Sequence, residues 1–263
     1  MRSSANSLSR HILVTYSCLR LGIAALGFVL PILLFVVGLS HGLGLQGSFS
    51  AYYHAFSDVP EIAHAVAGQG VARDWFVGIL WAIGACLVFY HGYDPREDIA
   101  LNSSGVLLIV VAMVPTGWLC GDSCPAISLH FVAAILFFVG ISYVAIFRSR
   151  DTVDLIQNKR TKARLSAFYI VLGVLMILLP VLAAWLNQFN MKIFGTSLIY
   201  WLESIAVYVF SIYWLAKTIE LKMTNADQAV LDGTLSRSNQ SRAGLAYWLD
   251  MTPSNLLEDV RPN

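Results

Sequence analysis

The sequence predicts an all-α protein, a bundle of six transmembrane helices with the N- and C-termini in the cytoplasm. Its 263 residues are 57% hydrophobic and only 13% charged, which is about half the charge of an ordinary soluble domain. The apolar residues are gathered into long blocks, which a soluble core does not need. The formal net charge of +1 provides no basic field that would attract nucleic acid.

Six of these blocks have the length of a membrane span. About 20 apolar residues in a helix cover the roughly 30 Å of hydrocarbon in a bilayer. The expected spans are, approximately, 21–41, 75–93, 100–119, 126–147, 166–187 and 195–216. Residues 11–19 either extend the first of these helices or lie along the cytoplasmic surface.

The positions of the basic residues give the orientation. With the N-terminus in the cytoplasm, all 17 Lys and Arg residues except Arg73 and Lys192 lie on the inner side. This positive-inside bias predicts a multi-pass protein of the bacterial inner membrane. We interpret the basic loop 148–164 as a topology anchor beside anionic lipid headgroups, with a lipid or protein docking site as the alternative.

The chain divides into a membrane domain, residues 1–220, and a partly flexible cytoplasmic tail, residues 221–263. The long outer loop 42–73 contains Ser-Phe-Ser-Ala-Tyr-Tyr-His at 48–54, which is too aromatic for a solvated linker. Long loops in compact proteins are usually functional or disordered. We expect this one to lie against the membrane interface or the bundle, where Tyr52 and Tyr53 find an amphipathic environment.

Glu203 is the first candidate for a functional side chain. It lies about eight residues into the sixth expected span, or roughly 12 Å along the helix at about 1.5 Å per residue. An ionisable group at that depth is costly and often marks a site for a ligand, a proton or a metal. The alternative is a structural Glu203 that ties helices together by hydrogen bonds.

Other polar residues belong to the same outer half as Glu203. Asp74 opens the second span, where it also suits a helix N-terminus beside Arg73. His130 lies one turn into the fourth span, where a hydrogen bond to a neighbour is the ordinary role. The candidate catalytic residues are Glu203, Asp74, His130 and Ser50, the candidate metal ligands are His54, Asp74, His130 and Glu203, and a ligand is expected to contact Tyr52, Tyr53, His54, Asp74, His130 and Glu203.

Two further groups have simpler interpretations. Cys120 and Cys124 flank a short outer loop, where an oxidising periplasm permits a disulfide but the spacing does not require one. At the inner end, residues 90–98 read Tyr-His-Gly-Tyr-Asp-Pro-Arg-Glu-Asp, which we interpret as a charged turn at the interface. There is no phosphate-binding loop, no dinucleotide-binding glycine motif and no His-Glu-x-x-His zinc motif.

The strings Ser-Phe-Ser-Ala-Tyr-Tyr-His (48–54), Arg-Asp-Trp-Phe-Val-Gly (73–78) and Tyr-His-Gly-Tyr-Asp (90–94) resemble the motifs of a family of bacterial polytopic membrane proteins. The later run of Glu203, Phe210, Trp214 and Lys217 fits the same pattern. The resemblance covers most of residues 45–217. It implies a polytopic membrane protein and supplies no activity.

A looser similarity is to the CREST-type membrane hydrolases, which include the alkaline ceramidases and combine Ser, Asp and His with a zinc ion near one membrane face. Ser50, Asp74 and His130 would take similar roles here. The chain departs from that pattern because it contains no His-x-x-x-His. Zinc would therefore need Glu203 or His54 as a substitute ligand.

Four functions follow as hypotheses. The leading one is a lipid or small amphiphile bound in an outward-facing polar pocket, with Asp74, His130 and Glu203 at its headgroup. The second is a metal-dependent membrane lipid hydrolase, with zinc as the cofactor. The third is a small proton-coupled transporter with Glu203 as the titrating group, although no internal repeat is visible. An assembly role for the basic loop and the tail is a fourth reading.

Overall fold

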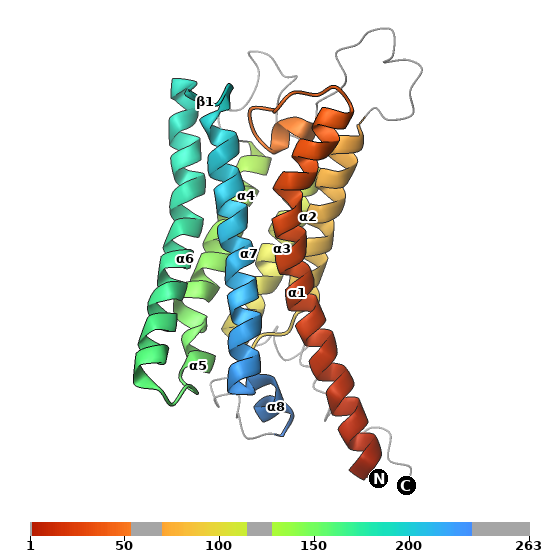
Figure 1. Ribbon diagram of the computed structural model, residues 1–263, viewed down its shortest axis with the longest axis vertical. Coiled ribbons are helices and arrows are strands. Elements are labelled where there is room, and N and C mark those ends of the chain that lie inside the picture. Colours follow the sequence, from red (N-terminus) through yellow and green to blue (C-terminus); the bar gives the residue numbers. More distant parts are fainter. Residues whose placement is uncertain (1, 54–69, 115–127, 233–263) are drawn as a thin grey trace.

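The computed structural model describes residues 2–53, 70–114 and 128–232. As the sequence predicted, the protein is all-α apart from one two-stranded hairpin (Figure 1). The long helices are α1 (Arg2–Ser40), α2 (Val71–Phe89), α3 (Pro95–Met113), α4 (Leu129–Tyr143), α6 (Lys159–Leu186) and α7 (Leu198–Thr224). The short elements are η1 (Ser50–Tyr53), η3 (Val144–Arg148), α5 (Arg150–Val153), η4 (Asn187–Phe189), β1 (Lys192–Ile193), β2 (Thr196–Ser197) and α8 (Ala226–Leu231).

Five helical segments in the described part of the chain are long and apolar enough to cross a membrane. The helix α3 is the long helix that does not meet this description. Its first turn carries Arg96, Glu97 and Asp98, so its apolar portion is shorter than the helix itself. The five segments are Leu8–Ser40, Val71–Phe89, Leu129–Val153, Lys159–Phe189 and Leu198–Thr224.

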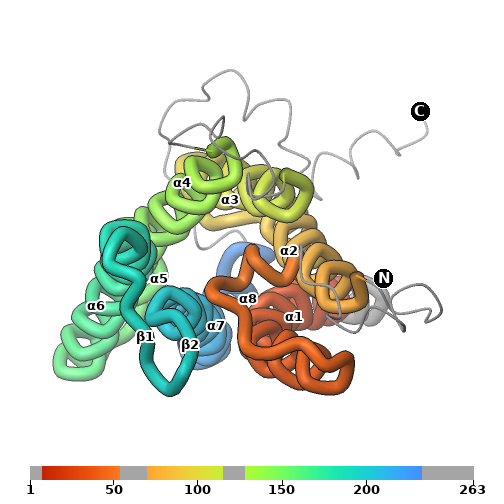
Figure 2. Tube along the Cα trace, turned by 90° about the horizontal axis from the view of Figure 1, so that it is seen from above, coloured from red at the N-terminus to blue at the C-terminus, as the bar shows by residue number. Residues whose placement is uncertain are grey.

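The six long helices form a closed ring. The order of contacts around it is α1, α2, α3, α4, α6, α7 and back to α1, and each helix packs against the next one. The view from above in Figure 2 shows this arrangement, with the first and last long helices side by side. The upper end of the ring in Figure 1 carries residues 41–53 and the β1–β2 hairpin, and the lower end carries the 90–94 turn, α5 and α8.

Polar side chains fix where most of these helices begin. The carboxylate of Asp94 accepts a hydrogen bond from the backbone N–H of Arg96, and Pro95 occupies the first helical position of α3. Ser128 caps α4 through the N–H of Phe131, and Ser197 caps α7 through the N–H of Ile199. These caps satisfy N–H groups that the first helical turn leaves without a carbonyl partner.

Small residues set the closest helix contacts. A Cβ atom at Gly84 would lie 2.8 Å from the carbonyl oxygen of Gly105, and one at Gly105 would lie 2.6 Å from the carbonyl oxygen of Gly84. The α2 and α3 backbones therefore touch at this pair. Between α1 and α7, a Cβ atom at Gly27 would lie 2.2 Å from the Ser211 hydroxyl. Small residues at helix interfaces are typical of membrane bundles, whose helices associate by close packing.

The outside of the ring is apolar. Leu39, Phe89, Val171 and Trp185 are more than half exposed, as are many other Leu, Ile and Val side chains along the long helices. In water such a surface would be an interaction site or an aggregation liability. Several apolar helices with outward-facing Leu, Val and Phe are compatible with a multi-pass membrane protein.

Candidate functional site

A cavity of about 560 Å³ lies inside the ring, toward its upper end. Most of its wall is apolar, which is typical of small-molecule sites. Every long helix contributes to this wall, so the cavity is enclosed by the ring itself. Representative lining residues, taken in ring order, are Leu30, Phe76, Leu108, Phe137, Ala183 and Phe210.

Residues 47–51 of the first upper loop line the cavity from above. The Ser48 hydroxyl accepts a hydrogen bond from the backbone N–H of Ala51 at 3.2 Å and lies 3.3 Å from the Ser50 hydroxyl. The Phe49 ring is buried and meets the Tyr200 ring edge-on, with centroids 5.3 Å apart. The loop is therefore a folded part of the site. The sequence had left open whether it lies against the interface or the bundle.

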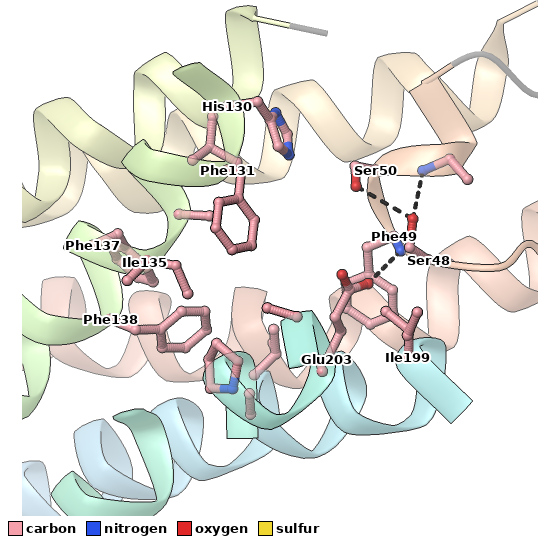
Figure 3. A pocket seen from close by; sticks show the side chains of 18 of the residues that line it. Ser48, Phe49, Ser50, His130, Phe131, Ile135, Phe137, Phe138, Ile199 and Glu203 are labelled. Carbon is pink, nitrogen blue, oxygen red and sulfur yellow. Dashed lines mark hydrogen bonds between the residues drawn. The ribbon is translucent and has the colours of Figure 1, made fainter. Parts of the chain in front are cut away.

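Glu203 holds this loop to α7. One carboxylate oxygen, Oε2, accepts a hydrogen bond of 2.6 Å from the backbone N–H of Phe49 (Figure 3). This distance is short for an N–H···O hydrogen bond, so the contact is close. Glu203 also lines the cavity, so the side chain both ties down the loop and presents a carboxyl group to the interior.

His130 reaches the cavity from α4, on a different wall from Glu203 (Figure 3). Its Nδ1 lies 2.7 Å from the Val114 carbonyl oxygen. Because a carbonyl only accepts, Nδ1 carries the proton, and a neutral ring then has Nε2 as an acceptor. His130 thus joins the end of α3 to the start of α4 and adds a polar group to the cavity wall.

The cavity brings together some of the residues that the sequence singled out and separates others. Glu203, His130 and Ser50 line it. Asp74 is largely exposed and forms an ion pair with Arg73, with Nε and Oδ1 3.3 Å apart, away from the lining residues.

The two tyrosines of the loop also lie outside the lining. Tyr52 is fully buried beside Tyr200, and the Arg73 guanidinium stands 6.0 Å from the centre of the Tyr53 ring. His54, Cys120 and Cys124 lie outside the described residues.

The polar groups of the cavity gather at its upper end. Asn187 and Asn190 follow the end of α6, and Ser197 precedes α7. Deeper in the ring the wall consists of Leu, Ile, Val, Phe and Ala side chains. Within the described ranges, no three His, Cys, Asp or Glu side chains are grouped as metal ligands. The arrangement suits a molecule with an apolar body and one polar end.

A second polar cluster, at the lower end, was missed by sequence reasoning. The Lys217 ammonium donates to the Thr152 hydroxyl at 2.5 Å and to Glu220 Oε2 at 2.9 Å. The Tyr169 hydroxyl donates to the same carboxylate oxygen at 2.8 Å. The spacing of Lys217 and Glu220, three residues apart on one helix, was the signal that could have revealed this pair.

Arg20 completes the lower cluster. It is fully buried, and its two terminal nitrogens donate to the two Asp227 carboxylate oxygens at 3.2 and 2.6 Å. The Tyr93 hydroxyl donates to the same carboxylate. Burial raises the pKa of Tyr93 above its ordinary value, so this hydroxyl stays protonated and keeps donating. These contacts fasten α8 to α1 and to the 90–94 turn.

The 90–98 segment is therefore less superficial than the sequence suggested. Glu97 is only 3% exposed and accepts a hydrogen bond of 2.9 Å from the Tyr93 backbone N–H. Asp94 lies 3.2 Å from Arg148 as well as capping α3. The expected charged turn therefore lies at the lower end of the ring, and its acidic side chains are hydrogen-bonded or ion-paired.

Comparison of the chain with models of protein families, with curated proteins and with solved structures found no match in any of the three.

Proposed function

We propose that this protein is a six-span protein of the bacterial inner membrane that binds a lipid or small amphiphile in its cavity. Both termini lie in the cytoplasm, and the upper end of the ring faces outward. The positive-inside distribution of Lys and Arg supports this orientation. The place of α3 in the ring, between α2 and α4, supports counting it as the sixth span.

The observation that carries the proposal is the shape and polarity of the cavity. About 560 Å³ falls within the roughly 300–1,000 Å³ of sites for drug-sized ligands. The apolar depth suits an alkyl chain. The carboxyl group of Glu203 and the imidazole of His130 suit a polar headgroup near the upper loop.

Filling the cavity tests the proposal. Ala184 lines the cavity from α6, so Ala184→Phe places a ring in the space that the ligand would occupy. The matched control is Val181→Phe, because Val181 is 47% exposed on the outer side of the same helix. We expect native mass spectrometry of the purified full chain to find a bound amphiphile in the unmodified protein and in Val181→Phe. We expect Ala184→Phe to lose it.

Equal retention by all three proteins would place the amphiphile on the outer surface and overturn the proposal. Loss in both variants would also count against it, because Val181 lies outside the cavity. A circular dichroism melt of each variant separates loss of the ligand from loss of the fold.

A further inference from the structure

We infer that the polar end of the ligand is a primary ammonium group, so that the cavity selects single-chain amines over anionic amphiphiles. The inference rests on the proposed function and adds the headgroup class. It draws on three observations: the lack of a cationic partner for Glu203 among the described residues, the composition of the described cavity wall, and the charges of the outer segments.

The Glu203 carboxylate lacks a cationic partner in the described part of the chain. Its Oε2 accepts from the Phe49 N–H, and the ion pairs of the described residues do not include it. A carboxylate inside a protein is costly unless a positive charge or several donors compensate it. An ammonium group donates up to three hydrogen bonds and supplies that charge.

The described part of the cavity wall has no cationic side chain to offset the charge of an anion. None of the described residues that line it is Lys or Arg. The other polar side chains of the described wall are hydroxyls, amides and one imidazole, and each of them can accept a hydrogen bond from an ammonium group. A phosphate or carboxylate headgroup would face Glu203 as a like charge without a guanidinium or ammonium to offset it.

The charges outside the cavity point the same way. In the proposed orientation the outer basic residues are Arg73 and Lys192, and Arg73 is already paired with Asp74. The remaining outer segments, 54–69 and 115–127, contain Asp58, Glu61 and Asp122 and no Lys or Arg in their sequence. In the proposed orientation, an excess of acidic over basic residues on the outer side of the membrane raises the local concentration of cations and lowers that of anions.

The size of the cavity limits the apolar part. At about 560 Å³, within a ring in which every helix touches its two neighbours, the space suits one alkyl chain. The structure therefore points to a single-chain molecule with an ammonium end at Glu203 and its chain among the Phe and Leu side chains below.

Four probes with the same chain test the headgroup: dodecylamine, dodecanol, dodecanoate and dodecyl phosphate. The full chain is placed in phosphatidylcholine nanodiscs, and empty nanodiscs correct for partitioning into lipid. We expect dodecylamine to bind roughly ten- to a hundredfold more tightly than dodecanol, since a hydrogen bond to a charged group is worth about 1.5–3 kcal/mol. The two anions should bind more weakly than dodecanol.

Two variants locate the effect. Glu203→Gln keeps an acceptor for the Phe49 N–H and removes the charge, so it should abolish the preference for dodecylamine over dodecanol. Asp74→Asn removes a carboxylate at the same end that lies outside the cavity, so it should keep the preference. A loss of preference in Asp74→Asn as great as in Glu203→Gln would show a surface effect and overturn the inference.

The remaining outcomes distinguish failure of the proposed selection of amines from failure of the proposed binding of an amphiphile. Equal binding of all four probes, blocked by Ala184→Phe, would leave the amphiphile site standing and overturn the selection of amines. Tighter binding of an anion would do the same. Failure of every probe to bind would remove the proposed function together with the inference.

Two further probes identify the source of the ammonium group. Lysophosphatidylethanolamine carries a primary ammonium, and lysophosphatidylcholine carries a quaternary one. Displacement of dodecylamine by the first and not the second assigns the site to a membrane aminolipid. Displacement by neither, with dodecylamine still bound, assigns it to a free amine. Displacement by lysophosphatidylcholine alone would contradict hydrogen bonding to a primary ammonium.

Discussion

Lys217 and Glu220 form an ion pair with side chains only 2% and 1% exposed. Removing two charges from water costs several kcal/mol each, and the pair regains this only with good geometry and added hydrogen bonds. Thr152 and Tyr169 supply such bonds, and they come from two other helical segments. The pair therefore ties α5, α6 and α7 together at the lower end.

Removing one member of this pair should be far more damaging than removing both charges. We expect Lys217→Met to destabilise the protein by about 3–5 kcal/mol, because Glu220 stays buried without its cation. Adding Glu220→Gln to that variant should restore much of the loss. Thermal unfolding in detergent measures both effects, and Lys222→Met, an exposed position on the same helix, serves as the control.

A melting temperature of Lys217→Met equal to that of Lys222→Met would mean that the pair contributes nothing to stability.

The sequence pointed to Glu203 because an isolated carboxyl in an apolar span stands out. It did not reveal the contacts of Lys217 with Thr152 and of Arg20 with Asp227, because the two residues of each contact lie far apart along the chain. The sequence analysis grouped Asp74 with the site because hydropathy indicates how deep a residue lies along a membrane span. Hydropathy does not indicate which face of the helix the residue occupies.

At the level of the elements, the sequence located each helix but not its ends. The expected span 100–119 became α3, Pro95–Met113, because Asp94 and Pro95 start the helix before the apolar run begins. The expected span 166–187 became α6, Lys159–Leu186, which starts at its Asn158 cap within the basic loop. Average hydropathy does not register caps, so it marks the portion of a helix in lipid and omits the turns that extend beyond it.

The contact of α2 with α3 depends on the absence of a side chain at Gly84. A methyl group there would meet the Gly105 carbonyl oxygen, and the backbones would have to separate. We expect Gly84→Ala to destabilise the protein by about 1–3 kcal/mol, the usual cost of overpacking. Gly78→Ala on the same helix should be neutral or stabilising, since nothing lies within 4 Å of its Cβ and alanine favours helix.

Thermal unfolding of the two alanine variants, compared with the unmodified chain, tests this contact. Equal melting temperatures for Gly84→Ala and Gly78→Ala would mean that α2 and α3 are not held in backbone contact. The sequence could not show this pairing, because glycine has many roles in helices and only the ring geometry brings these two residues together.

At the level of the whole molecule, the ring places its two polar ends far apart. The upper end holds the cavity and its loop, and the lower end holds the network around Arg20 and Lys217. The sequence predicted the fold class and the asymmetry of charge. It did not predict that the helices close into a ring, because the hydrophobic periodicity of one helix does not indicate which other helices it packs against.

The two ends should differ in their access to water on the two sides of the membrane. Gln157 and Gln188 are exposed residues near opposite ends of α6, so each can carry a single cysteine in a chain whose native cysteines are replaced. In intact spheroplasts a membrane-impermeant maleimide should label Gln188→Cys. Gln157→Cys should react only after permeabilisation, because the proposed orientation puts the basic loop inside. Labelling in the reverse pattern would invert the orientation.

The ring also dictates an order of assembly. Arg20 and Asp227 are 207 positions apart, and α1 packs against α7, so neither contact exists until the ribosome has made nearly all of the described chain. Until then the Arg20 guanidinium of α1 lacks the Asp227 carboxylate that it binds in the complete fold. The ring of helices therefore closes late in synthesis, and a nascent chain stalled before α7 would lack the contact of α1 with α7 that closes it.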